Sequence, residues 1–302
     1  MDYNDLQKDV LRLKKEKGAL ILAHYYQTLD VQDIADFVCD SYEMAKKAKA
    51  AQNRLIVICG VKFMAESAKI LSPDKKVLLP AMDAGCPMAD MVEPQGVLKL
   101  KERYPDAAVM CYVNSSAKVK AVSDICCTSS SAVRIAKNIE AKKIIFIPDK
   151  NLGSFVAQQV PEKEFILWQG YCPTHERITE EDIQNAKIAC PNGKFAVHPE
   201  CRAEVLKYAD FIGSTAEIIK FAKHSPYKEI IIGTEMGILE RLIRELPDKK
   251  IVSVKSAFVC PNMKKTRLES VRDCLEREDN EVMLDTGEIE AAKQSLDRMI
   301  SV

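Results

Sequence analysis

Short apolar runs alternate with amphipathic segments along the chain, and this alternation occurs three times. The first apolar run of each stretch covers residues 19–26, 107–114 and 193–200. His24, Tyr112 and His198 stand at the matching polar position of these runs, 88 and then 86 residues apart. Self-similarity at a fixed period indicates copies of one structural unit, so the chain is predicted to contain three.

Two further apolar runs follow in each unit. They cover 55–60 and 75–81 in the first unit, 143–148 and 163–170 in the second, and 229–233 and 249–256 in the third. The segments between them, such as 33–51 and 130–143, repeat apolar residues at the spacing that is typical of helices. Short strands that alternate with such helices predict a parallel sheet covered by helices on both faces. The predicted fold class is therefore α/β, with three pseudo-symmetric three-layer αβα domains around a pseudo-threefold axis.

One helix is predicted to join each unit to the next. These helices cover residues 93–104, 179–189 and 264–276. The predicted domains are accordingly 1–91, 92–176 and 177–276. We expect the remaining segment, 277–302, to end in a helix that packs back on the first unit and completes it.

The composition describes a globular protein without an electrostatic bias. Of its 302 residues, 47% are apolar and 29% are charged, which is enough for buried cores. Lys+Arg and Asp+Glu both number 44, and no basic run occurs, so nucleic acid is not expected as a partner. The first residues lack the apolar core of a signal peptide, and no run approaches the roughly 18 apolar residues of a membrane span. We therefore expect a soluble, cytoplasmic protein with no membrane partner.

Three of the 11 cysteines occupy equivalent positions in the three units. Cys86, Cys172 and Cys260 each follow the third apolar run of a unit, and each precedes a proline. A lone free cysteine is usually a core residue. Three cysteines at equivalent positions of three repeated units are different, because such positions converge on the symmetry axis. There their thiolates can bind one metal centre. The others are expected to be core residues, and they are Cys39, Cys59, Cys111, Cys126, Cys127, Cys190, Cys201 and Cys274.

Three thiolates suit a [4Fe–4S] cluster in which one iron has no protein ligand. Such an iron is a Lewis acid that can take a substrate hydroxyl and help it leave as water. Zinc with three cysteines and a water is the alternative metal. His175, three residues after Cys172, is a candidate fourth ligand for zinc.

Polar residues follow the first run of every unit at matching places, and they provide proton donors and acceptors. They are His24, Tyr26, Tyr112, Asn114, His198 and Glu200. The carboxyl ends of parallel strands gather at one edge of a sheet, where α/β proteins bind their ligands. If three such edges meet at an axis, these side chains face one central cavity.

A hydroxyl group comes 16 or 17 residues after His24, Tyr112 and His198. The hydroxyl positions are Ser41, Thr128–Ser129 and Ser214–Thr215. A Ser or Thr before a helix is commonly an N-cap, and the free N–H groups of a helix N-terminus bind phosphate or carboxylate. Three such helix starts around one cavity favour an anionic substrate with several acidic groups. The chain has neither a phosphate-loop nor a dinucleotide-binding motif, so nucleotide binding has no support.

Several longer motifs resemble those of the quinolinate synthase family, the iron–sulfur enzymes of NAD biosynthesis. The motifs are AHYYQ (23–27), DIADFVCDS (33–41), GVKFMAESAKIL (60–71), YVNSSAKVKA (112–121), PDKNLG (148–153), HPEC (198–201) and GSTAE (213–217). The three cysteine loops match as well. The resemblance extends from about residue 18 to residue 266, and its motifs occur in order, so it is more specific than any single pattern.

The resemblance implies a [4Fe–4S] cluster on Cys86, Cys172 and Cys260. It implies the condensation of iminoaspartate with dihydroxyacetone phosphate to quinolinate, with loss of phosphate and two waters. It further implies a functional link to an L-aspartate oxidase or dehydrogenase that supplies iminoaspartate.

Residue roles also follow from the resemblance. His24, Tyr26 and Glu200 are implied as acid–base groups, with His198 beside them and His175 near the cluster. The implied substrate-binding residues are His24, Ser41, Tyr112, Asn114, Ser129, His198, Glu200, Ser214 and Thr215.

The sequence departs from the family pattern at two places. Tyr25 replaces the asparagine that the family commonly has, and only Cys274 follows Cys260, so the C-terminal CxxC redox switch of some relatives is not predicted.

Two other classes of function compete with this hypothesis. A non-catalytic iron–sulfur or zinc protein, such as a sensor, would keep the three cysteines without needing the His, Tyr and Glu set. A metal-free lyase or aldolase for phosphorylated sugars would use the helix N-termini, and Schiff-base chemistry would need a lysine in the pocket. Lys62 and Lys150 lie near strand ends, but no threefold pattern selects either of them.

Overall fold

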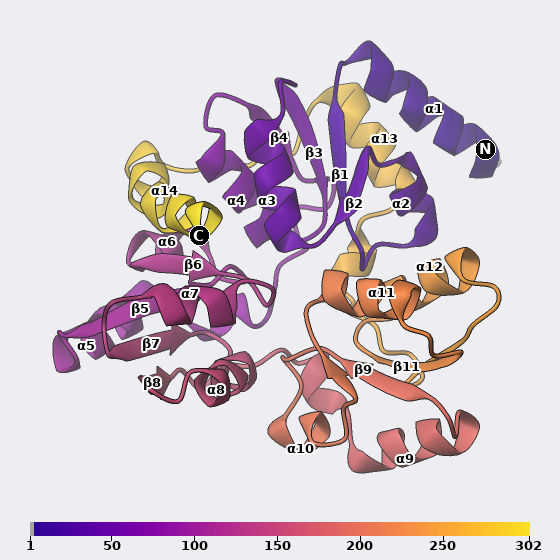
Figure 1. Cartoon of the computed structure of the whole chain (residues 1–302). Helices are drawn as coiled ribbons and strands as arrows, with labels where there is room; N and C mark the ends of the chain where they lie inside the picture. Colours follow the sequence, from indigo (N-terminus) through magenta and orange to yellow (C-terminus); the bar gives the residue numbers. More distant parts are fainter. Residues whose placement is uncertain (1–2) are drawn as a thin grey trace.

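The first unit is built on a four-stranded parallel sheet. A computed structural model describes residues 3–302 of the chain (Figure 1). The strands are β1 (Leu20–His24), β2 (Phe37–Cys39), β3 (Leu55–Cys59) and β4 (Lys76–Leu78), and the helices between them are α2 (Leu29–Ile34), α3 (Ser41–Ala50) and α4 (Lys62–Leu71). The strand order is β2-β1-β3-β4. β1 and β3 are buried along their whole length because helices cover both faces of the sheet.

The other two units have the same topology, with orders β6-β5-β7-β8 and β10-β9-β11-β12. The second unit contains β5 (Ala107–Tyr112), α6 (Ala117–Ala121), β6 (Ile125–Cys127), α7 (Ala132–Asn138), β7 (Lys143–Ile147), α8 (Lys150–Gln159) and β8 (Glu164–Leu167). The third contains β9 (Lys194–Val197), α10 (Ala203–Leu206), β10 (Phe211–Ile212), α11 (Thr215–His224), β11 (Glu229–Gly233), α12 (Gly237–Glu245) and β12 (Lys250–Ser253). All strand pairs within the sheets are parallel, and the predicted fold class is confirmed.

A short 3₁₀ turn and a linking helix follow the last strand of every unit. The turns are η1 (Ala89–Met91), η2 (His175–Arg177) and η3 (Met263–Lys265), and the helices are α5 (Pro94–Arg103), α9 (Glu180–Ala189) and α13 (Leu268–Arg277). Helix α1 (Tyr3–Glu16) precedes the first unit, and α14 (Thr286–Ser301) ends the chain. The third linking helix begins later than predicted because residues 263–265 form the 3₁₀ turn.

The second strand of each unit was not predicted from the sequence. Residues 33–51 were expected to be one helix, and that expectation is wrong. Helix α2 ends at Ile34, strand β2 follows, and α3 begins at Ser41. The three second strands are only two or three residues long, so they cannot display the alternation by which strands are recognised.

An aspartate clamp recurs in all three units. Asp36, Asp124 and Asp210 precede the second strands, and each accepts a hydrogen bond from a backbone N–H of the first strand at 2.7–2.9 Å. The backbone N–H of each aspartate donates to the carbonyl of that same first-strand residue at 2.9–3.0 Å. The clamp therefore attaches each short edge strand to its sheet. Its repetition supports the threefold duplication independently of the apolar pattern.

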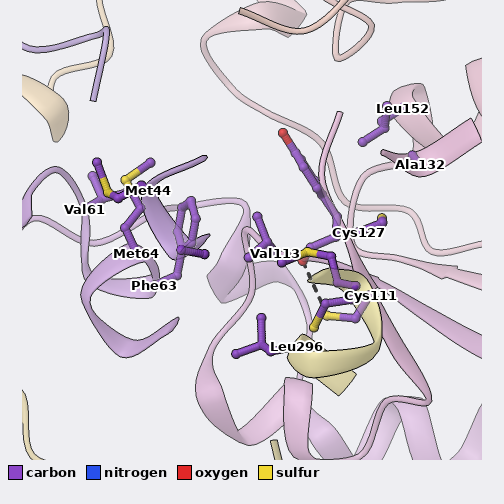
Figure 2. Packing of buried hydrophobic residues seen from close by; sticks show 14 of the residues in the cluster. Met44, Val61, Phe63, Met64, Cys111, Val113, Cys127, Ala132, Leu152 and Leu296 are labelled. Atoms are coloured by element: carbon purple, nitrogen blue, oxygen red, sulfur yellow. Dashed lines mark hydrogen bonds between the residues drawn. The ribbon is translucent and has the colours of Figure 1, made fainter. Parts of the chain in front are cut away.

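One apolar cluster extends across the units. Figure 2 shows Phe63 and Met64 of the first unit and Cys111 and Val113 of the second among its buried members. Leu296 of α14 belongs to the same cluster and is fully buried. Because the three sheets share part of their core, their relative positions are fixed by packing as well as by the linking helices.

The two C-terminal helices pack on different parts of the molecule. Helix α14 contacts α4 of the first unit, and it also contacts α6 and β6 of the second unit (Figure 1). Helix α13 packs against α1, where Leu268, Val271 and Leu275 join the core on the outer side of the first sheet. The first unit is thus completed mainly by α13, whereas α14 bridges two units. No helix among residues 3–302 is long and apolar enough to cross a membrane.

The aspartate clamp leads to a stability prediction. In Asp210→Ala, the N–H of the fully buried Phe195 loses its 2.9 Å acceptor, which should lower the free energy of unfolding by about 1–2 kcal/mol. Urea denaturation followed by circular dichroism measures this change.

Asp106→Ala is the matched control. The Asp106 carboxylate is 63% exposed and forms only a surface ion pair with Lys143, so its loss should cost less than about 0.5 kcal/mol. Equal destabilisation by the two substitutions would contradict the role assigned to the clamp.

Candidate active site

A central cavity of about 200 Å³ lies where the carboxyl ends of the three sheets meet. Every unit contributes lining residues from loops that directly follow strands. Of the residues predicted from the sequence, the cavity brings together His24, Tyr26, Ser41, Cys86, Tyr112, Asn114, Ser129, Cys172, His198, Glu200, Thr215 and Cys260. Ser214 does not line the cavity. Its hydroxyl caps α11 by accepting a hydrogen bond from the backbone N–H of Glu217.

The three predicted cysteines line this cavity from equivalent loops. In each loop the cysteine is followed by a 3₁₀ turn that begins three residues later. Backbone N–H groups at the starts of these turns lie beside the sulfurs and favour their ionised form: those of Met88 and Ala89 for Cys86, that of His175 for Cys172, and those of Asn262 and Met263 for Cys260. Donors aimed at sulfur stabilise the thiolate, which is the form that binds metal.

Burial opposes ionisation of the same thiols. It raises the pKa of Cys86 to about 12 and raises the pKa values of Cys172 and Cys260 above the ordinary thiol range. Cys86 lies close enough to Cys172 and Cys260 for their charges to interact. Three half-buried thiolates that line one cavity need a cation to be stable, so the donor set and its N–H groups fit a metal centre.

One compact group of possible metal ligands lines the cavity. In the described part of the chain, this group consists of Cys172, His175 and Glu200. Their possible ligand atoms all lie within 4.8 Å of one another. Cys86 and Cys260 do not join it. Cysteine ligands of a single tetrahedral zinc are only about 3.8 Å apart. The three sulfurs are not gathered into one such compact group, whereas a single zinc ion on three cysteines would hold them this close.

Glu200 lies at the centre of a buried network. Its Oε2 is 2.7 Å from Nδ1 of His175, and its Oε1 accepts a 2.5 Å hydrogen bond from the Tyr112 hydroxyl. Burial alone would raise the pKa of Glu200, but His175 and His198 beside it, together with the Tyr112 hydroxyl, lower it well below its usual value. The carboxylate is therefore ionised although it is almost inaccessible to water.

Two buried imidazoles complete the acid–base set. Burial lowers the pKa of His24 to about 3 and that of His198 to about 4, so both are neutral near pH 7. The His24 ring packs edge-on against Tyr26, and the His198 ring stacks on His175 with their centroids 4.9 Å apart. Neutral imidazoles next to an ionised carboxylate can accept protons, and the buried phenols can donate them.

The predicted hydroxyl residues do not all occupy the same position at the starts of their helices. Asp40, and not Ser41, is the N-cap of α3, because its carboxylate accepts from the backbone N–H of Glu43. Thr128 and Ser129 precede α7, whose N-cap is Ser131. Ser41, Thr128 and Ser129 line the cavity, and their hydroxyls are not occupied as helix caps.

Sequence reasoning missed several residues of the site. Thr234 and Glu235 directly follow β11, at the positions that Pro148 and Asp149 occupy after β7. The Glu235 carboxylate is fully buried, pairs with Lys264 at 3.0 Å and accepts a hydrogen bond from the backbone N–H of Cys260. Lys264 also donates to the carbonyl of Tyr26. The sequence signal for Thr234 and Glu235 was a pair of polar residues directly after a buried strand. This pair occurs in one unit only, so a search for threefold patterns did not select it.

Other groups define the charge of the cavity. Arg177 lines it and is its only arginine or lysine in the described part of the chain. Neither Lys62 nor Lys150 lines the cavity, and the Nζ of Lys150 lies 3.4 Å from Glu176. The Schiff-base alternative therefore lacks a lysine at this site.

Comparisons with known proteins agree with this geometry. The family model described as quinolinate synthetase A protein matches residues 8–301. The chain belongs to the quinolinate synthetase A family.

Relatives named quinolinate synthase resemble this chain over most or all of its length. Those of Caldicellulosiruptor bescii and Alkaliphilus metalliredigens are 53% and 48% identical to it over 302 residues, which is all of each chain. That of Clostridium perfringens is 50% identical over 281 residues, 93% of each chain. The resemblance inferred from the sequence motifs is confirmed.

The departure from the quinolinate synthetase A pattern at Tyr25 lies outside the cavity. The Tyr25 side chain is half-buried, does not line the cavity, and faces the guanidinium of Arg241 at 5.7 Å from its ring centroid. Gly237 makes the close approach between these units possible, since a Cβ there would lie 2.8 Å from the Tyr25 carbonyl oxygen. Tyr25 therefore contributes to the contact between the first and third units and not to the lining of the cavity.

The buried imidazoles lead to a prediction for stability against pH. An unfolded histidine has a pKa near 6.5, whereas the folded pKa of His24 is about 3. Between these values the unfolded chain binds one more proton than the folded chain. The stability that comes from burying a neutral His24 is therefore complete above about pH 6.5 and is lost as the pH falls toward 3. His24→Gln should remove up to about 1.4 kcal/mol per pH unit from the slope of unfolding free energy against pH.

Urea denaturation between pH 5.5 and 7.5 measures this slope. His224→Gln is the control, because that imidazole is exposed at the end of α11 and should leave the slope unchanged. The same slope in both variants would contradict the burial of a neutral His24.

Proposed function

We propose that the chain is a quinolinate synthase that condenses iminoaspartate with dihydroxyacetone phosphate and releases phosphate and water. The observation that carries the proposal is one cavity, lined from all three units by Cys86, Cys172, Cys260 and the acid–base groups, in a member of this family. The relatives bear the name of that activity.

The proposed cofactor is a [4Fe–4S] cluster held by Cys86, Cys172 and Cys260. It is supported by the donor chemistry of three cysteines that line one cavity from equivalent loops, and by the backbone N–H groups beside the sulfurs. When bound, a cluster with one iron free of protein ligands supplies a Lewis acid for loss of a hydroxyl as water. The compact group of Cys172, His175 and Glu200 favours a single zinc ion as the second candidate.

The acid–base work is proposed for His24, Tyr26, His198 and Glu200. Condensation and ring closure require protons to be removed from carbon and nitrogen and delivered to departing oxygens. Glu200 and the neutral imidazoles can accept such protons within the cavity, and the Tyr26 and Tyr112 hydroxyls lie beside them. Burial keeps bulk water away from these groups, which strengthens their electrostatic effect on the reactants.

The substrate anions are proposed to bind opposite this set. Ser41, Ser129 and Thr215 offer hydroxyls at the starts of helices or just before them, and Arg177 offers a guanidinium. The Oδ1 atom of Asn114 is buried without a hydrogen-bond partner, so it is free to accept from a substrate N–H or O–H group.

Iminoaspartate is a reactive imine, so the proposal includes an L-aspartate oxidase or dehydrogenase as its source.

The cluster predicts how metal content responds to substitution. Anaerobically reconstituted protein should contain about four irons per chain, absorb near 400 nm and form quinolinate. Cys172→Ser should lose most of this iron and the activity, whereas Cys274→Ser, a change on the buried face of α13, should keep both. Iron and sulfide analysis with a quinolinate assay measures these outcomes, and one zinc per chain with no iron would overturn the proposal.

The acid–base assignment predicts that substitutions lower turnover without changing the iron content. Tyr26→Phe and Glu200→Gln should each lower kcat by about 100-fold or more, since each removes a proton-transfer group. Tyr25→Phe is the matched control, because this neighbouring phenol lies outside the cavity. Full turnover by both cavity variants would refute the assignment.

A further inference from the structure

Two buried thiols lie side by side in the second unit, and neither takes part in the proposed chemistry. Cys111 of β5 and Cys126 of β6 are register partners, and both are fully buried. Partners on neighbouring strands of a sheet point to the same face, and the strands are about 4.8 Å apart. A disulfide spans Cα separations of about 4.4–6.8 Å, so these two cysteines can be joined without moving the strands.

A buried ammonium group lies beside this pair. The Nζ of the fully buried Lys120 donates to the carbonyl of Ser115 and lies 5.6 Å from the centroid of the Phe63 ring, and neither partner carries a negative charge. Burial raises the pKa of the Cys111 thiol, but Cys126, Lys120 and nearby hydroxyls lower it to a net value below that of a free thiol. Of the two cysteines, Cys111 therefore forms the nucleophilic thiolate more readily.

Helix α14 covers the pair. It contacts α6 and β6, the Cys126 thiol donates to Oγ of Ser295 at 3.4 Å, and that hydroxyl donates to the Lys120 carbonyl at 3.0 Å. Because α14 is not hydrogen-bonded into any of the three sheets, its detachment breaks fewer contacts than the opening of a central strand. A molecule as small as hydrogen peroxide can reach the sulfurs during such an opening.

We propose that Cys111 and Cys126 are an oxidation-sensitive pair that closes into a disulfide when hydrogen peroxide reaches it beneath α14. The Cys111 thiolate attacks one peroxide oxygen, the O–O bond breaks, and a sulfenic acid forms while the departing hydroxide takes up a proton as water. The Cys126 thiol then attacks the sulfenic sulfur, the S–S bond forms, and a second water leaves. Two thiols are thus oxidised to one disulfide, and one peroxide is reduced to two waters.

The disulfide removes two contacts near α14. The Cys126 sulfur has no proton left to donate to Ser295, and the Cys111 sulfur can no longer carry a charge beside Lys120. A buried ammonium without a negative neighbour is unfavourable. We therefore expect oxidation to weaken the packing of α14 on the second unit.

Peptide mapping tests the cross-link, and its result does not depend on the proposed function. The full-length chain, purified anaerobically with its metal, is treated with hydrogen peroxide and a chelator for released iron, and its remaining thiols are blocked with iodoacetamide. Trypsin should then release residues 104–118 joined to residues 121–134. Fragmentation of the joined peptides should place the bond at Cys126 and not at Cys127.

Cys127→Ala is the matched control. Cys127 is the equally buried neighbour of Cys126 on β6, and it points to the opposite face of the sheet. The joined peptides should persist in Cys127→Ala and disappear in Cys126→Ala. Their absence from the unsubstituted chain after peroxide has oxidised its other thiols, or a bond placed at Cys127, would overturn the proposal.

The rate of cross-linking tests the role of α14. Leu296→Ala removes a fully buried side chain of α14 and eases local opening, so the disulfide should form about fivefold faster or more. Leu275→Ala, which removes a fully buried leucine of α13, should change this rate by less than about twofold. Equal acceleration by the two substitutions would contradict access beneath α14.

Hydrogen exchange measured by mass spectrometry tests the consequence of oxidation. Backbone amides of α14 should exchange faster in the cross-linked chain than in the reduced chain, whereas those of α13 should not change. Unchanged exchange in α14 would contradict the weakened packing.

Discussion

Every strand of the three sheets is parallel to its neighbours, and this constraint decides where chemistry can occur. Parallel strands end at the same edge, so the loops that follow them gather there, while the faces of the sheet are covered by helices. With three sheets arranged so that these edges meet, residues as distant in sequence as Tyr26 and Thr234 come within 2.7 Å of each other. No single unit contains a complete site. The site exists only where the units meet.

The buried charges of the site are stable because each has partners from other units or loops. Glu200 is ionised next to His175 and Tyr112, and Glu235 is paired with Lys264 and two backbone N–H groups. An ionised carboxylate in a buried region without such partners would take up a proton or destabilise the fold. The network therefore serves stability and reactivity together. A change at one member alters the electrostatics experienced by the others.

The sequence predicted those features that occur in triplicate. Equivalent spacing identified the first, second and third apolar runs of each unit and the three cysteine loops, because duplicated units retain positions that the fold requires. It did not identify β2, β6 and β10, which are too short for a periodic pattern. It also missed Thr234 and Glu235, which occur in one unit only. Thr234 gains its importance from a contact with Tyr26, 208 positions away, and Glu235 from its pairing with Lys264. The bridging position of α14 was missed for a similar reason, since an amphipathic helix shows that it has a partner but not which one.

The packing of α13 on α1 has a consequence for how the chain reaches its final form. The apolar outer face of the first sheet is covered partly by Leu268, Val271 and Leu275, which are synthesised long after the strands of that sheet. As the polypeptide emerges from the ribosome, the N-terminal unit appears first but keeps this face uncovered until almost the whole chain is available. Domains usually fold in order of synthesis, and uncovered apolar surface invites aggregation. The first unit is therefore completed only after the second and third units have been made, so a ribosome that stalls before α13 releases a product whose first sheet is partly uncovered.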